Sequence, residues 1–92
     1  MVDYRITILK QAIKDKEKIK QFPALRKNAE NLIELMQVDP FQSPPPYELL
    51  IGNWKGLYSR RINRKHRLVY KVLEEEKIIV IVSMWSQYER LY

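Results

Sequence analysis

The amino-acid sequence predicts a small α+β domain in which a helical hairpin packs on one face of a small twisted antiparallel sheet. Three observations support this fold class. An alternating, β-branched stretch opens the chain, two stretches with helical apolar spacing follow, and three strand-like stretches occupy the second half. The predicted element order is therefore β-α-α-β-β-β. The 92 residues suit one domain that spans residues 1–92.

The first half of the chain is expected to hold one strand and two helices. Residues 4–9, YRITIL, alternate in polarity, which favours a strand. Residues 10–22 are polar with a patchy apolar stripe, which indicates a helix. Pro23 can open the second helix at its first position. That helix carries a regular apolar stripe that we expect to face the core: Leu25, Ala29, Leu32, Ile33 and Met36.

Four prolines separate the helices from the rest of the chain: Pro40, Pro44, Pro45 and Pro46. Proline lacks an N–H group and restricts the backbone, so we expect an extended, stiff loop without regular pairing. Such a loop would hold Tyr47 and Glu48 in place.

Three strands are expected after a turn that includes both glycines, at residues 57–62, 67–73 and 77–85. Polar turns, NRKH and EEE, join them. The third of these strands is a nearly continuous apolar run. We therefore expect it to be central in the sheet or covered on both faces.

Composition excludes several classes of function. The chain has no cysteine, so it has neither disulfides nor thiolate metal sites. His66 is the sole histidine, which excludes multi-histidine sites, and we expect no metal and no cofactor. No segment approaches the roughly 20 apolar residues of a membrane span, and the first residues lack a signal peptide. We expect a soluble cytoplasmic protein that has no membrane partner.

Positive charge concentrates in the second half of the chain. The net charge is +6, and residues 49–73 contain no acidic side chain. Such a surplus attracts polyanions, and nucleic acid is the favoured partner. We expect one face of the sheet to carry the arginines. Aromatic side chains are interleaved with them, and core packing is the favoured interpretation of three: Tyr58, Tyr70 and Trp85.

Glu48 stands alone between the prolines and this basic window. A carboxylate beside arginines can take a proton from a ribose 2′-hydroxyl that the arginines hold. The hydroxyl would then attack the adjacent phosphate and cut RNA without a metal. A solvated loop glutamate is the alternative that these residues leave open.

Two stretches of the second half resemble the YoeB/Txe toxins of the RelE-like superfamily. They are PFQSPPPYELLIGNWKGLYSRRINRKHRLVYKV, residues 40–72, and SMWSQYE, residues 83–89. The resemblance implies a RelE-like fold and a ribosome-dependent mRNA endonuclease that cuts the message in the ribosomal A site. It also implies metal-independent cleavage to a 2′,3′-cyclic phosphate, and a cognate antitoxin of the YefM/Axe type. Relatives can dimerise, so a homodimer stays open.

The resemblance also assigns roles to single residues. Glu48 matches the general base, and Arg67 matches the arginine that stabilises charge on the pentavalent phosphate. Tyr88 matches the tyrosine that stacks on or orients the substrate base. Arg60 and Arg61 match paired arginines, of which at least one should assist with phosphate or ribosomal RNA.

The remaining cations have less definite roles. Arg64 and Lys65 are expected in a turn, and two interpretations stay open: they contact ribosomal RNA, or they have no binding role. Some relatives have a lysine at the position of Ile51, so one phosphate contact is missing here or Lys55 replaces it. His66 is interpreted as part of the turn, with a structural hydrogen bond.

Gln87 departs from the family pattern. Relatives carry a histidine at this position, the proposed general acid for the leaving oxygen. Glutamine has no proton to give near neutral pH, and loss of a general acid typically lowers the rate about 10²–10⁴-fold. Three explanations stay open: a weakened natural toxin, a variant with another proton donor, or an engineered change. The alternative function is a module that binds the ribosome or the antitoxin and inhibits by occupancy without cleaving.

Overall fold

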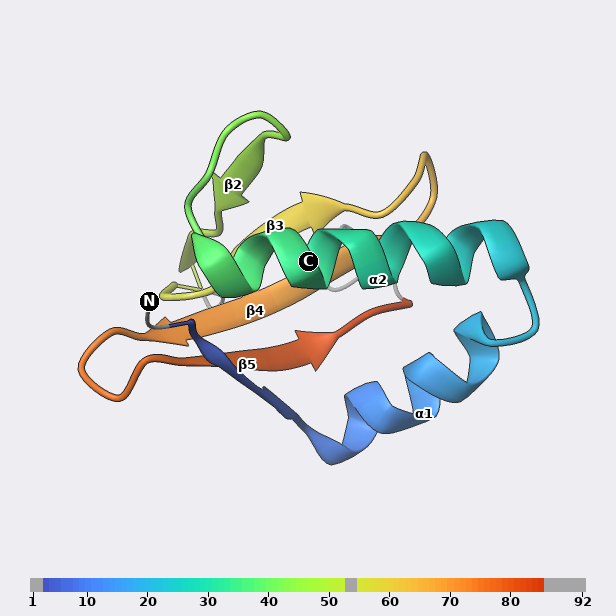
Figure 1. Ribbon diagram of the computed structural model, residues 1–92, viewed down its shortest axis with the longest axis horizontal. Coiled ribbons are helices and arrows are strands. Elements are labelled where there is room, and N and C mark those ends of the chain that lie inside the picture. The colour runs from blue at the N-terminus through green and yellow to red at the C-terminus, as the bar shows by residue number, and fades with distance from the viewer. Residues whose placement is uncertain (1–2, 53–54, 86–92) are drawn as a thin grey trace.

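The computed structural model describes residues 3–52 and 55–85. Within these residues it has two helices and one five-stranded sheet, which confirms the α+β class (Figure 1). In chain order the elements are β1 Arg5–Ile8, α1 Lys10–Ile19, α2 Pro23–Val38, β2 Tyr47–Leu49, β3 Tyr58–Arg61, β4 Arg67–Leu73 and β5 Ile78–Ser83.

The sheet differs from the predicted one in two respects. The order of strands is β1-β5-β4-β3-β2, and β2 is an additional strand that begins directly after Pro46. The prolines themselves stay outside the ladder, but pairing starts at the first residue beyond them. In addition, β1 pairs parallel with β5, so the sheet is mixed and not antiparallel throughout. The residue pattern of a strand does not specify its neighbour, because pairing is decided by how the whole chain folds back.

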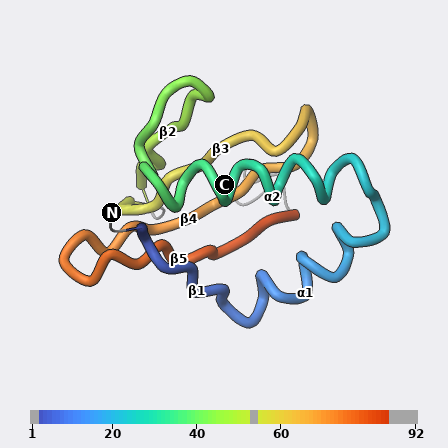
Figure 2. Tube along the Cα trace, viewed as in Figure 1, coloured from blue at the N-terminus to red at the C-terminus, as the bar shows by residue number. Residues whose placement is uncertain are grey.

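The helical hairpin covers one side of the sheet, as predicted. Figures 1 and 2 show α2 running across the view in front of β3 and β4, with α1 beside the end of β5. Pro23 lies in the first turn of α2, where its missing N–H is not needed. The expected stripe of α2 joins the core: Leu25, Ala29, Leu32 and Met36 are buried and Ile33 packs against them.

Strand β5 lies inside the sheet, between β1 and β4, which agrees with its apolar composition. Its side chains are all buried or half-buried. None of the described helices is long and apolar enough to cross a membrane.

Alternation along the strands separates a core face from an opposite face. Tyr47 pairs with Arg60, and Arg60 pairs with Leu68, so these three side chains lie on the core face. The neighbouring pair, Glu48 and Ser59, therefore lies on the opposite face. This division decides which side chains can form a site.

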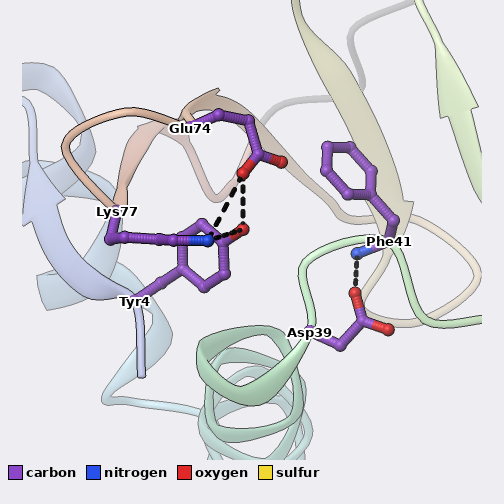
Figure 3. Close-up of polar contacts among 5 residues, drawn as sticks. All are labelled: Tyr4, Asp39, Phe41, Glu74 and Lys77. Carbon is purple, nitrogen blue, oxygen red and sulfur yellow. Dashed lines mark hydrogen bonds and ion pairs between the residues drawn. The ribbon is translucent and has the colours of Figure 1, made fainter. Parts of the chain in front are cut away.

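Short polar contacts fix the first strand and the end of α2 (Figure 3). The Tyr4 hydroxyl donates to Glu74 Oε1 at 2.7 Å, and Lys77 Nζ lies 3.4 Å from the same hydroxyl. The hydrogen bond to Glu74 raises the pKa of Tyr4 above its ordinary value. At the end of α2, Asp39 Oδ1 accepts a hydrogen bond of 3.0 Å from the backbone N–H of Phe41, which starts the proline-rich loop with a tight turn.

Candidate active site

Glu48 and Arg67 meet on the face of the sheet that lies opposite the core. Glu48 is in β2, Arg67 begins β4, and Ser59 of β3 lies between them in the sheet. Arg67 Nη1 lies 3.1 Å from Glu48 Oε1 and 3.5 Å from Ser59 Oγ. The expectation that Glu48 stands beside an arginine is confirmed, and Glu48 belongs to a strand and not to a solvated loop.

The two partners of this ion pair differ in exposure. The Arg67 side chain is 15% exposed, whereas that of Glu48 is 59% exposed. The sheet therefore holds the guanidinium in place, and the carboxylate stays accessible from solvent. This arrangement suits a base that must reach a bound substrate.

A cavity of about 240 Å³ opens beside the ion pair. Arg61 reaches it from the end of β3, so two guanidinium groups and one carboxylate face the same space. Arginine donors bind phosphate oxygens through charge-assisted hydrogen bonds. The cavity is lined by Pro46, Tyr47, Glu48, Ser59, Arg61 and Arg67.

Arg60 lies on the core face, and the prediction that it binds phosphate or RNA is wrong. Its exposed fraction is 1%. It makes four hydrogen bonds, none of them to an acidic group: Nε to Tyr70 Oη at 3.2 Å, Nη1 to Pro45 O at 2.6 Å, and Nη2 to Pro40 O at 2.9 Å and Gln42 O at 2.8 Å. A guanidinium that is buried and bonded in this way cannot reach an RNA phosphate.

The reason is the geometry of a strand. Successive side chains of a strand point to opposite faces of the sheet, so Arg60 and Arg61 cannot lie on the same face. Arg61 is exposed on the side of the candidate site, as expected for one member of the pair. Only the assignment of both arginines to one surface fails.

Tyr70 completes the buried network around Arg60. Its side chain is 0% exposed, and its hydroxyl donates to Pro40 O at 2.9 Å while it accepts the hydrogen bond from Arg60. Burial raises the pKa of Tyr70 above its ordinary value, although the charge of Arg60 acts in the opposite direction. The core interpretation of Tyr70 is confirmed, and Tyr58 and Trp85 pack against the same core.

His66 has the structural role that was expected. Its Nδ1 donates to the backbone oxygen of Trp85 at 2.7 Å, and the two rings lie 4.2 Å apart. Asn63 Oδ1 accepts hydrogen bonds from the backbone N–H groups of Lys65 and His66, which closes the turn before β4.

The other expected residues are not gathered around Glu48. Lys55, Arg64 and Lys65 are exposed, and they are not among the residues that line the cavity. Gln87 and Tyr88 lie outside the described residues. Within residues 3–52 and 55–85, no group of three or more histidine, aspartate or glutamate side chains is placed to hold a metal ion.

Comparison with known proteins first identifies the fold. The fold matches the archaeal RelE-RelB complex from Pyrococcus horikoshii OT3 with a TM-score of 0.75 and 21% identity, over 94% of this chain and 97% of the matched chain. The chain therefore has the RelE-like fold.

The family follows from closer matches. The model of the YoeB-like toxins of bacterial type II toxin–antitoxin systems matches residues 10–88, and the chain belongs to this family. It is 38% identical to Toxin YoeB of Synechocystis sp. over 66 residues, 72% of this chain and 74% of that toxin. It is also similar to the toxin of the YoeB-YefM complex from Staphylococcus aureus, with 32% identity and a TM-score of 0.80 over 92% and 98% of the two chains.

Proposed function

We propose that this protein is a ribosome-dependent mRNA endonuclease that inhibits translation by cutting the message in the ribosomal A site. One observation carries the proposal: Glu48 Oε1 lies 3.1 Å from Arg67 Nη1 beside a cavity that Arg61 also lines. Membership in the YoeB-like toxin family supports it.

The reaction needs one base, phosphate donors and a proton for the leaving group. Glu48 takes the proton of the ribose 2′-hydroxyl, and the 2′-oxygen attacks the adjacent phosphorus. The bond from phosphorus to the 5′-oxygen breaks, which leaves a 2′,3′-cyclic phosphate and, after protonation, a free 5′-hydroxyl. Arg67 and Arg61 donate hydrogen bonds to the phosphate oxygens and stabilise the added negative charge. No step requires a metal ion.

Tyr88 and Gln87 complete the proposed site. Tyr88 stacks on the substrate base and orients it. Gln87 can only hydrogen-bond, so the leaving 5′-oxygen takes its proton from water or from another group. Loss of a general acid lowers a rate about 10²–10⁴-fold, and we therefore propose that the activity is attenuated.

A cognate antitoxin of the YefM/Axe type is the proposed partner. The S. aureus relative was solved in complex with YefM, and the basic face that carries Arg61 and Arg67 suits an acidic segment. Such an association weakens as salt is added, because surface charges are screened. The protein acts in the cytoplasm, where the ribosomes are, and a homodimer is a further proposed state.

Primer extension on an actively translated message tests the function. We expect cuts inside translated codons with this sequence, stronger cuts with Gln87→His, and cuts that are about 10²–10⁴-fold slower with Glu48→Gln. Absence of cuts from both of the first two proteins would overturn the enzymatic proposal. An untranslated copy of the same message is the control for dependence on the ribosome.

Gln87 favours a second candidate function, inhibition by occupancy. A toxin without a proton donor can still fill the A site or bind its antitoxin. Translation that stays inhibited by the Glu48→Ala and Arg67→Ala double variant, with the message intact, would support this candidate. Loss of inhibition together with loss of cleavage would reject it.

A further inference from the structure

The loop between α2 and β2 has more hydrogen-bond acceptors than donors. Four of the seven residues from 40 to 46 are proline and carry no N–H. Two of the other N–H groups are used at the start of the loop, since Phe41 donates to Asp39 Oδ1 and Gln42 donates to Asp39 O. Pro40 is fully buried, and a buried carbonyl must be paired, so the loop takes donors from elsewhere in the chain.

Arg60 supplies these donors. Its guanidinium binds the carbonyls of Pro40, Gln42 and Pro45 at 2.6–2.9 Å and the hydroxyl of Tyr70 at 3.2 Å. Burying a charge is costly unless polar groups replace the lost water. No carboxylate in the described part of the chain is ion-paired with Arg60, so its charge is stabilised by the loop carbonyls themselves.

The same guanidinium also fixes the strand that carries the proposed base. Tyr47 is opposite Arg60 in the sheet, and its ring centroid lies 5.0 Å from the guanidinium carbon. β2 has only three residues and lies at the edge of the sheet, so its own ladder is short. With Tyr47 held on the core face, the next residue, Glu48, must point to the opposite face toward Arg67.

We propose that Arg60 is a positioning residue for the cleavage reaction. It ties the proline-rich loop and Tyr47 to β3, and this contact fixes Glu48 at its distance from Arg67 without any contact between Arg60 and RNA. The proposal rests on the proposed function of Glu48. It also joins the proline run and the first arginine of SRRI, which the sequence presents as separate features, into one structural unit.

Hydrogen exchange tests the positioning without reference to cleavage. The probe is the backbone amide of Leu50, which donates to Leu57 O at 2.9 Å just beyond β2. With Arg60→Lys and Arg60→Met we expect this amide to exchange at least about tenfold faster, while the amides of β4 and β5 keep their rates. A matched control is Arg26→Met, which removes an exposed arginine from α2. If the exchange rates of all amides rise equally, Arg60 stabilises the whole fold and not β2 in particular, and the proposal is overturned.

Single-turnover cleavage at saturating ribosome concentration tests the connection to Glu48. Arg60→Lys keeps the positive charge but not the fork of donors, and we expect the rate to fall about 10²-fold, as for a misplaced catalytic group. The ribosome concentration for half-maximal rate should not change. In a Glu48→Gln background, Arg60→Lys should cause no further loss, because both act through the same group.

The outcomes separate the two proposals. If the rate losses of Arg60→Lys and Glu48→Gln multiply in the double variant, and the ribosome binds more weakly, then Arg60 contacts the RNA. That result would overturn the proposal that Arg60 is a positioning residue. If the unaltered protein does not cleave, even with Gln87→His, the proposed function fails. The exchange rate of the Leu50 amide would still decide whether Arg60 holds β2.

Discussion

Tyr70→Phe isolates the buried hydroxyl that links Arg60 to the proline-rich loop. The substitution deletes one oxygen from a side chain that is 0% exposed and preserves the ring. Two hydrogen bonds disappear, one from Arg60 Nε at 3.2 Å and one to Pro40 O at 2.9 Å. Pro40 O keeps its hydrogen bond from Arg60 Nη2, so only the N–H at Nε is left without a partner.

The expected loss follows from this count. A hydrogen bond to a charged group contributes about 1.5–3 kcal/mol, and a buried donor without a partner costs about 1–3 kcal/mol. These figures describe the same missing contact, so we expect the free energy of unfolding to fall by about 2 kcal/mol. For a domain of this size, 1 kcal/mol corresponds to about 4–8 °C, and the melting temperature should fall by about 8–16 °C.

Urea denaturation and thermal melting at neutral pH measure the loss. The matched control is Tyr58→Phe, because the Tyr58 ring stacks on Tyr70 with centroids 5.6 Å apart. No hydrogen bond of the Tyr58 hydroxyl is found within residues 3–52 and 55–85, so this variant should change stability by less than about 0.5 kcal/mol. A Tyr70→Phe protein as stable as the control would refute the reasoning about the network.

The difference between the unaltered protein and Tyr70→Phe should also depend on pH. Burial raises the pKa of Tyr70 above its ordinary value of 10.0, so the folded state favours the neutral phenol. The resulting stabilisation is complete below about pH 10 and is lost as the pH rises further. The difference in stability between the two proteins should therefore shrink above pH 10, and a difference that grows there would contradict the sign.

Three further predictions concern the core, a turn and the basic face. Met36→Ala should lower the free energy of unfolding by about 2–5 kcal/mol because Met36 is 0% exposed; in urea denaturation, the exposed Val38→Ala should change it little. Gly56→Ala should lower the free energy of unfolding by about 1 kcal/mol or more in the same assay, because the φ of Gly56 is +91°. The added Cβ would meet no other atom within 4 Å, so the loss would come from backbone strain alone, and an unchanged midpoint would contradict that strain. Arg61→Ala should reduce the slope of log affinity for RNA against log salt by about 1, as measured by filter binding; an unchanged slope would exclude Arg61 as a phosphate contact.

The periodic segments are the part of the fold that the sequence predicts well. Residues 67–73 form a strand with the expected bounds, and Pro23 opens α2, because local spacing and backbone chemistry decide both. β2 was missed because three prolines precede it directly and the strand has only three residues. The sequence does not predict that β1 pairs in parallel with β5, because this pairing joins residues more than 70 positions apart.

The candidate site was predicted in part for similar reasons. Glu48 and Arg67 are 19 residues apart, and β3 brings them together through a ladder that residue patterns do not encode. The family resemblance supplied that pair. Arg60 was assigned to the wrong face, although the signal was present, because adjacent residues of a strand alternate. Its partners are backbone carbonyls of a proline-rich loop, which only the folded structure brings into reach.

A ribosome programmed with a message that carries a single 2′-deoxynucleotide at the cut position tests the central claim most directly. Glu48 is proposed to act on the 2′-hydroxyl, so removal of this one oxygen should abolish cleavage there, while the all-ribose message is cut to a 2′,3′-cyclic phosphate. Equal cleavage of both messages, or an intact all-ribose message with Gln87→His, would contradict the account.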